Sequence, residues 1–290
     1  MSVTGQGHAV GTDGMALSLG ELWRTYNESH GIHRVLEDAV YYERHLPPRV
    51  GSTSLRLLEI GIQSGGSARA WKQWYGDRLY YAGVDVEPKC KRTESPAENM
   101  WVEIGSQYNQ TFLSQLCKKH GPFDIVIDDG AHRPEAIRAS LKAIFPADSA
   151  CMRYPSLYVI EDMQTMVMSR YQRVQNSPQD MLDIVGEAFW SMHAAYYDVV
   201  GWRKNAYGTN HSSHPIFGRL ASEVHLYDSI AFIVRDHKKG KRGNGEVHRG
   251  KSFIGYGAGH PRKQIREAAA EVKLGHVQAV PKLSNAGADV

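Results

Sequence analysis

The sequence predicts an α/β fold of the Rossmann-like kind, a three-layer sandwich around a mostly parallel, seven-stranded sheet. Three observations support this prediction. Five short apolar runs alternate with stretches of helical periodicity, which is the pattern of buried parallel strands joined by crossover helices. Polar residues follow every one of these runs. The last two strand-like runs are separated by only two residues, so they predict an antiparallel hairpin at the end of the sheet.

The first 50 residues are expected to form helices ahead of the sheet. Apolar residues recur at helical spacing over 19–26 and again over 35–46. Pro47 and Pro48 end the second pattern, because a residue that precedes proline avoids the helical conformation. We therefore separate a helical N-terminal extension, residues 1–50, from a domain that spans residues 51–236.

The strands and helices of this domain follow from run length and periodicity. Strands are predicted at 55–60, 79–84, 100–104, 123–127 and 157–160, and the hairpin at 223–226 and 229–234. Helices are predicted at 67–75, around 112–116 and at 134–145. A long helix is expected to begin after Ser177, with that serine as its cap and Pro178 in the first helical position.

The composition excludes several classes of protein. With 42% hydrophobic and 22% charged residues, the 290-residue chain is not mainly disordered. No run of 18 apolar residues predicts a membrane helix, and the N-terminal residues do not resemble a secretory signal, so a cytoplasmic protein is expected. Cys90, Cys117 and Cys151 are far apart and lack a CxxC pair, which favours reduced thiols over a disulfide framework or a zinc site.

The formal net charge of +3 is unevenly distributed. Residues 237–290 contain 11 Lys and Arg against 4 Asp and Glu, whereas the other 236 residues contain 23 against 27. The acidic body makes a nucleic-acid partner improbable. We interpret residues 237–290 as a basic, glycine-rich, flexible tail; a lid, or a contact with an anionic partner, is the alternative.

The ends of the predicted strands carry the candidate site, because ligands of open parallel sheets bind at the carboxyl ends of the strands. The loop after the first strand reads E-x-G-x-x-x-G-G-S from Glu59. Its glycines let the backbone approach a ligand, whereas Glu59 would repel a pyrophosphate and suits the ammonium group of S-adenosylmethionine. Asp85 is placed to accept hydrogen bonds from ribose hydroxyls. The glycine spacing and Glu59 disfavour the alternative of a nicotinamide-dependent oxidoreductase.

Three carboxylates follow the fourth and fifth strands. Asp129, Glu161 and Asp162 would repel one another unless a cation joined them, and all-oxygen ligation suits Mg²⁺. Each of them alone could instead cap a helix or stabilise a turn. His132 lies three residues after Asp129, and its pKa range suits a general base.

Several segments resemble a known family. LLEIGIQSGGSARAWKQW, VEIGSQYNQTFL, FDIVIDDGAH and LYVIEDM are similar to metal-dependent class I methyltransferases that modify the sugars of macrolide antibiotics, a group that includes cephalosporin-hydroxylase-like proteins. The resemblance covers roughly residues 31–234. Two departures are Cys151–Ser156, where the family has a Gly-Gly turn, and Ser106, where it often has Asp.

The resemblance implies an S-adenosylmethionine- and Mg²⁺-dependent O-methyltransferase. Its acceptor would be one of two vicinal hydroxyls of a sugar, a glycosylated natural product or another small polyhydroxy molecule, with no membrane partner. His132 and Asp129 would be catalytic, and Asp129, Glu161 and Asp162 would hold the metal ion. A homo-oligomer, dimer or tetramer, is compatible with the sequence, and a non-enzymatic adapter that binds through the basic tail is a rival. The expected donor-binding residues are Glu59, Gly61, Gly65, Ser67, Asp85, Ser106, Gln107 and Asp128.

Overall fold

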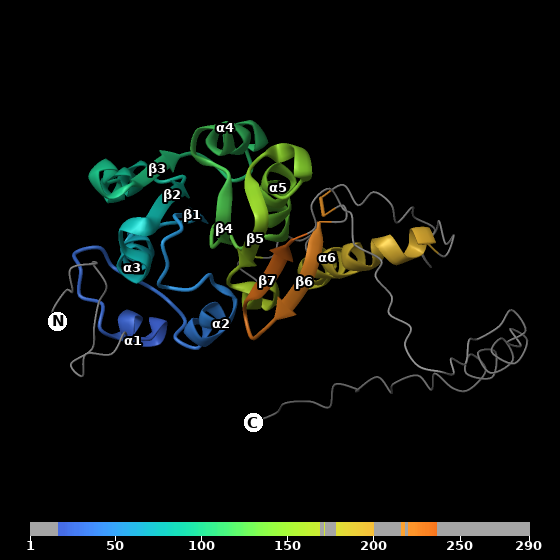
Figure 1. The fold of residues 1–290 in the computed structure, drawn as a ribbon, viewed down its shortest axis with the longest axis horizontal. Helices are drawn as coiled ribbons and strands as arrows, with labels where there is room; N and C mark the ends of the chain where they lie inside the picture. The colour runs from blue at the N-terminus through green and yellow to red at the C-terminus, as the bar shows by residue number, and fades with distance from the viewer. Residues whose placement is uncertain (1–16, 169–170, 172–177, 200–215, 218–219, 237–290) are drawn as a thin grey trace, which may run out of the picture. The chain divides into compact units, whose positions relative to one another are not determined.

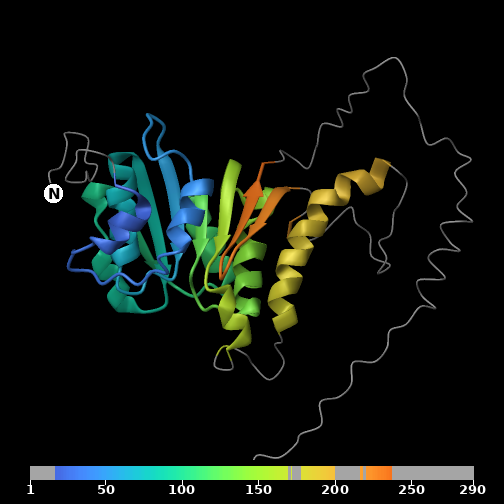
Figure 2. The same cartoon turned by 90° about the horizontal axis from the view of Figure 1, so that it is seen from below.

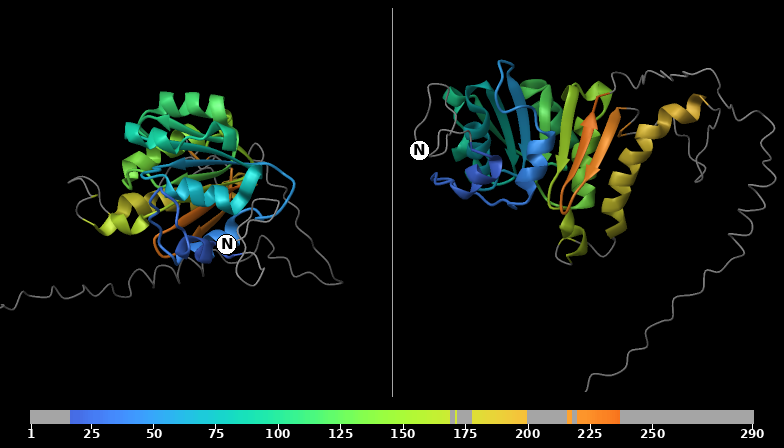
Figure 3. Two further views of the ribbon diagram at one scale, coloured as in Figure 1. Left: turned by 90° about the vertical axis from the view of Figure 1, so that its left-hand side faces the viewer. Right: turned by 60° about the horizontal axis from the view of Figure 1, so that its bottom comes forward.

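The computed structural model describes residues 17–168, 171, 178–199, 216–217 and 220–236. A seven-stranded sheet lies between two layers of helices, which confirms the predicted fold class (Figures 1 and 3). The strands are β1 Leu55–Ile60, β2 Leu79–Asp85, β3 Met100–Ile104, β4 Phe123–Asp128, β5 Met152–Ile160, β6 Ala221–Leu226 and β7 Ala231–Arg235.

The strand order is β3-β2-β1-β4-β5-β7-β6. Strands β1 to β5 are parallel, β7 is antiparallel to β5, and β6 is antiparallel to β7. The chain therefore reverses its direction across the sheet between β3 and β4, and the carboxyl ends of β1 and β4 lie side by side at this switch point. A crevice at the switch point is where open α/β sheets bind ligands.

The α-helices are α1 Leu19–Arg24, α2 Asp38–His45, α3 Gly66–Tyr75, α4 Gln110–His120, α5 Pro134–Ile144 and α6 Pro178–Val199. Short 3₁₀ helices are η1 Gly76–Arg78, η2 Pro88–Thr93, η3 Pro96–Glu98, η4 Ala147–Ser149 and η5 Met163–Val167. Helices α4 and α5 cover one face of the sheet, and α1, α2 and α3 cover the other (Figure 1). Helix α6 lies beside β6 at the sheet edge (Figure 2).

Alternation along the strands sends side chains into two separate cores. In β1, Leu58 and Ile60 pack with α4 and α5, whereas Leu55 and Leu57 pack with the N-terminal helices. Both faces of the central strands are buried, which explains why these segments read as continuous apolar runs rather than as alternating patterns.

The N-terminal helices share a core with the sheet. Helix α1 begins with a capping box between Ser18 and Glu21. Tyr42 of α2 is fully buried and makes edge contacts with Trp71 of α3 and Phe232 of β7. The segment predicted as an N-terminal extension therefore packs against α3 and β7 of the domain that follows it.

The strand boundaries differ from the prediction most clearly at β5 and at the hairpin. Strand β5 begins at Met152 rather than at residue 157, because its polar first half, which does not resemble a buried strand, still pairs with the start of β4 across a register shift. The hairpin connection contains residues 227–230 rather than two residues; within it, Ser229 adopts a positive φ and the Tyr227 amide donates to the Ile230 carbonyl.

The cysteine prediction is wrong for one pair. The structure joins Cys117 and Cys151 in a disulfide, with their Cα atoms 4.8 Å apart, and leaves Cys90 buried and free. The two residues are 34 positions apart in sequence. They meet because the end of α4 and the residue before β5 both lie next to the start of β4, where the Phe123 amide donates to the Cys151 carbonyl.

Several predictions fall on residues outside the described part of the chain. These are the basic tail at 237–290 and the Ser177 cap of the long helix. None of the described helices has both the length and the apolar composition needed to cross a membrane.

Candidate active site

The glycine loop after β1 has a backbone that only glycine accommodates at two positions. Gly61 has a φ of +90°, and a Cβ there would lie 2.1 Å from the Asp129 carbonyl oxygen. Gly65 has a φ of +85°, and a Cβ there would lie 2.2 Å from Oγ1 of Thr93. Because Gly61 has no Cβ, the end of β1 can approach the end of β4 closely. Because Gly65 has no Cβ, the loop can pack against η2.

Asp85 joins the loops that follow β1 and β2. Its Oδ2 accepts the Gln63 amide at 2.9 Å, and its Oδ1 accepts the Glu87 amide at 2.9 Å. The carboxylate still lines the cavity at this edge of the sheet. It is therefore both a fixed part of the loop structure and an acceptor available to a ligand.

Two cavities open at this edge and share Gly61, Asp85 and Gly130. The larger, about 450 Å³, also includes Ser67, Asp129, His132 and Asp162. The smaller, about 150 Å³, lies beside Ser106, Gln107 and Tyr108 after β3. Together they have the size and the mixed polar and apolar lining of a small-molecule site.

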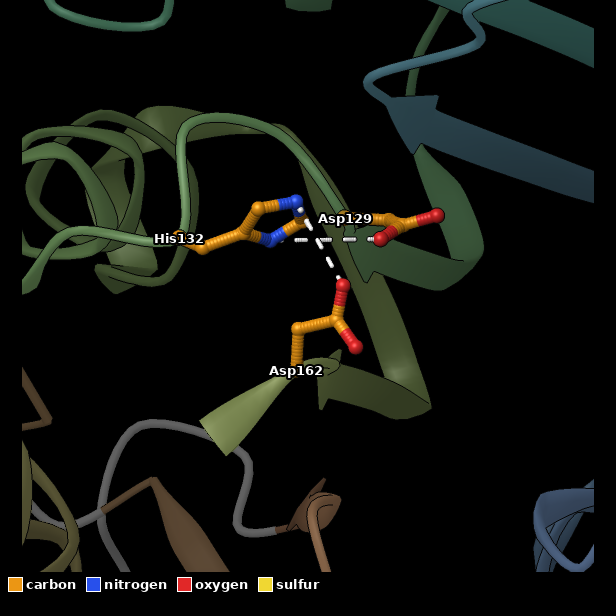
Figure 4. A group of neighbouring side chains, drawn as sticks. All are labelled: Asp129, His132 and Asp162. Atoms are coloured by element: carbon orange, nitrogen blue, oxygen red, sulfur yellow. Dashed lines mark ion pairs between the residues drawn. The ribbon is translucent and has the colours of Figure 1, made fainter. Parts of the chain in front are cut away.

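Asp129, His132 and Asp162 form a cluster in the larger cavity (Figure 4). His132 Nε2 lies 3.4 Å from Asp162 Oδ2, and His132 Nδ1 lies 4.0 Å from Asp129 Oδ1. One potential ligand atom from each residue lies within 4.8 Å of the other two. His132 and Asp162 both have a positive φ, of 51° and 55°, which is uncommon for residues other than glycine.

This donor set fits a hard divalent cation. The carboxylates of Asp129 and Asp162 lie beside one another next to His132, and carboxylate oxygens are the ligands that hard divalent cations prefer. His132 Nδ1 is buried and has no hydrogen-bond partner within the described part of the chain. Burial, followed by the charge of Glu161, raises the pKa of Asp129 well above its usual range, although the charge of Arg34 acts in the opposite direction.

Arg34 is the main site residue that the sequence analysis did not identify. It lies between α1 and α2, and its guanidinium contacts Glu59, Asp129 and Glu161. Tyr42 donates to the second oxygen of Glu161. No local pattern marks Arg34, because its three partners are 25, 95 and 127 residues away in sequence.

Glu59 and Glu161 therefore lie below the cavity rather than on its surface. Glu59 is fully buried, and its oxygens accept from Arg34 and, at 2.5 Å, from the Tyr81 hydroxyl. Neither glutamate lines the two cavities. Glu59 was predicted to bind the ammonium group of the donor; in the structure its carboxylate already pairs with the Arg34 guanidinium.

Asp128 is also placed differently from the prediction. It is 2% exposed and accepts from Ser140, from Tyr158 at 2.8 Å and from Gln107 Nε2 at 3.1 Å. Gln107 in turn accepts the Ala131 amide at 2.7 Å. Asp128 does not line the smaller cavity. It orients Gln107, which does.

The remaining predicted donor residues lie at the cavities or support them. Gly61 and Asp85 line both cavities, Ser67 lines the larger, and Ser106 lines the smaller. Gly65 does not line either cavity, but its close approach to Thr93 shapes the loop. The residues predicted from the strand ends thus lie at or near the two cavities, and burial decides which of their side chains line them.

No family model matches the chain. Demethylmacrocin O-methyltransferase of Streptomyces fradiae is 39% identical over 132 residues, which are 43% of this chain and 31% of that protein. Mycinamicin VI 2''-O-methyltransferase of Micromonospora griseorubida is 28% identical over 214 residues, 71% of this chain and 49% of that protein. The chain therefore spans about half, or less, of the length of these relatives.

A solved structure of the MycE methyltransferase from the mycinamycin biosynthetic pathway, in complex with Mg, S-adenosylhomocysteine and mycinamycin VI, has a similar fold. Its TM-score is 0.58 at 25% identity, over 80% of this chain and 57% of that chain. Both the sequence matches and the fold agree with the resemblance drawn from the strand-end motifs. The chain is therefore similar in sequence and in fold to O-methyltransferases that act on macrolide natural products, over about half or less of their length.

Proposed function

We propose that the chain carries an S-adenosylmethionine- and Mg²⁺-dependent O-methyltransferase activity toward a sugar hydroxyl of a small glycosylated natural product. The observation that carries this proposal is that one cavity contains the glycine loop, Asp85 and the cluster of Asp129, His132 and Asp162. A methyl donor and an activated hydroxyl must meet within bonding reach, and a shared cavity provides that proximity.

The donor would occupy both cavities. Asp85 lies where the cavities join and offers its carboxylate to the ribose hydroxyls. The smaller cavity, whose lining includes Val86, Gln107 and Tyr108, suits the adenine ring. Gly61 permits close approach of the donor to the backbone at the end of β1.

Asp129, Glu161 and Asp162 are the residues that would hold the metal ion. Glu161 would share its oxygens with Arg34 and Tyr42, which a carboxylate can do because each oxygen accepts more than one contact. When bound, Mg²⁺ lowers the pKa of a hydroxyl in its coordination sphere and orients it.

His132 is the proposed general base. It would take the proton of the acceptor hydroxyl on its ring, and the resulting imidazolium would face Asp162 through Nε2, at 3.4 Å, and Asp129 through Nδ1. The hydroxyl oxygen would form a bond to the donor methyl carbon as the carbon–sulfur bond breaks, and the sulfonium would become a neutral thioether. General-base assistance of this kind contributes about 10²–10⁴-fold to the rate.

The first experiment measures transfer of labelled methyl groups from S-adenosylmethionine to mycinamicin VI and to demethylmacrocin, with Mg²⁺ and with EDTA. We expect transfer only with the divalent ion. Undiminished transfer in EDTA would refute the metal role. Thermal shifts with S-adenosylmethionine and with NADH test the donor class, since only a bound ligand raises the melting temperature; stabilisation by NADH alone would favour an oxidoreductase.

The second experiment tests the base. His132→Gln should retain S-adenosylhomocysteine binding and lose about 10²–10⁴-fold in kcat. His225→Gln is the matched control, because His225 lies on β6, away from both cavities, and pairs with Glu223. A kcat for His132→Gln close to that of the control would remove His132 from this role.

A further inference from the structure

Arg34 holds three carboxylates that belong to different strand ends. Its side chain is 5% exposed. Nη2 pairs with Glu59 at the end of β1, and Nη1 pairs with Glu161 after β5 and, at 3.2 Å, with Asp129 after β4. A single guanidinium thus contacts residues that we assign both to the donor side and to the metal side of the site.

The backbone around Arg34 is fixed by the fold. The Gly66 amide, at the start of α3, donates to the Gly31 carbonyl at 3.1 Å. A Cβ on Gly66 would lie 2.2 Å from that same oxygen, so the segment at 31–34 packs directly on α3. The packing of this segment on α3 therefore places Arg34 beside the acids.

The charges around Arg34 do not balance. Glu59, Asp129, Glu161 and Asp162 can carry four negative charges, and Arg34 supplies one positive charge. Buried carboxylates without a counter-charge are costly. A divalent cation would relieve this excess, but it requires oxygens of Asp129 and Glu161 that already contact the guanidinium.

We infer that Arg34 is an internal cation that competes with the divalent ion for Asp129 and Glu161. It keeps the acids together when no ion is bound, and it weakens the binding of the ion when one arrives. This inference rests on the proposed metal site. Competition follows from Coulomb's law, because a positive charge a few ångströms from a dication opposes its binding, most strongly in a buried environment where water screens poorly.

The test compares Arg34→Met with the wild type. Met keeps the length and apolar character of the side chain and removes the charge. Titration with Mn²⁺ by calorimetry, at fixed pH and without donor, should show at least about tenfold tighter binding in Arg34→Met. In EDTA, Arg34→Met should melt at a lower Tm than the wild type, because the acids then lack a counter-charge. Excess Mn²⁺ should raise the Tm of Arg34→Met by more than it raises the Tm of the wild type.

Two further variants keep the test decisive. Arg138→Met removes one positive charge on α5, where Arg138 pairs with Glu187 at 2.7 Å, and should leave Mn²⁺ affinity unchanged. Arg34→Lys retains the charge but cannot bridge three carboxylates, so its Mn²⁺ affinity should lie between those of the wild type and Arg34→Met. If Arg34→Met does not fold in EDTA, the affinity of Arg34→Lys carries the comparison.

If the Arg34 variants that fold bind Mn²⁺ no more tightly than the wild type does, the inference is overturned and the proposed metal site remains intact. Absence of Mn²⁺ binding to the wild type, together with methyl transfer that is indifferent to EDTA, would overturn the metal site and the inference with it. The two failures are therefore distinguishable from the wild-type titration alone.

Discussion

Asp38 makes a quantitative prediction about stability and pH. It is the first residue of α2 and is 7% exposed, and its Oδ1 has no hydrogen-bond partner among the described residues. Burial, with the charge of Glu161 as the next cause, raises the pKa of Asp38 from 3.8 to about 7. The folded protein therefore holds the Asp38 proton more tightly than the unfolded chain does.

The direction of the effect follows from proton linkage. Because the pKa of Asp38 is raised on folding, protonation of this group stabilises the fold below about pH 4, and that contribution is lost as the pH rises through about 7. At about 1.4 kcal/mol per pKa unit, the loss amounts to at most about 4 kcal/mol. Relaxation around the ionised carboxylate reduces this figure, so about 2–4 kcal/mol is expected.

The assay is urea denaturation of the wild type and Asp38→Asn at intervals from pH 4.5 to pH 8, in EDTA. Asn has the same shape and no charge. The free energy of unfolding of Asp38→Asn minus that of the wild type should increase by about 2–4 kcal/mol over this range. Glu37→Gln is the control, since it removes a carboxylate from the adjacent, exposed position. A difference that stays constant with pH for Asp38→Asn would refute the reasoning.

Three other predictions concern the loop, the cysteines and the metal. Gly61→Ala should destabilise the fold by about 2–4 kcal/mol, because its Cβ would meet the Asp129 carbonyl and its φ is positive; an unchanged urea midpoint would contradict this. Thiol titration of the denatured, unreduced protein should detect one reactive thiol, that of Cys90, and three reactive thiols would exclude the disulfide. Reduction of the Cys117–Cys151 disulfide should lower the free energy of unfolding by about 4 kcal/mol, because the bond closes a loop of 34 residues. Mn²⁺ affinity should increase with pH, because the raised pKa of Asp129 makes protons compete with the ion, and a flat pH profile would argue against Asp129 as a ligand.

The cysteine pair and β5 show where sequence reasoning reached its limit. Residues 152–156 contain Arg153 and Pro155 and do not resemble a buried strand, yet the sheet continues through them. Cys117 and Cys151 lack any local pairing motif. The start of β4 pairs with the start of β5, and the two cysteines meet beside it. A partner from elsewhere in the chain leaves no periodic signal in the segment itself.

The sequence by itself determined the α/β sandwich, because buried parallel strands and amphipathic helices have local apolar periods. It also predicted that Asp85, Asp129, His132 and Asp162 lie near one another, because each lies at or shortly after the end of a strand and parallel strands share one carboxyl edge.

Only the tertiary structure decided how the acids are used. Arg34 reaches Glu59, Asp129 and Glu161 from a segment that precedes the sheet, and it leaves Glu59 and Glu161 below the cavity. The physical reason is that burial and charge pairing depend on which side chains meet in space. A guanidinium that meets a carboxylate 127 residues away has no signature in its own neighbourhood of the chain.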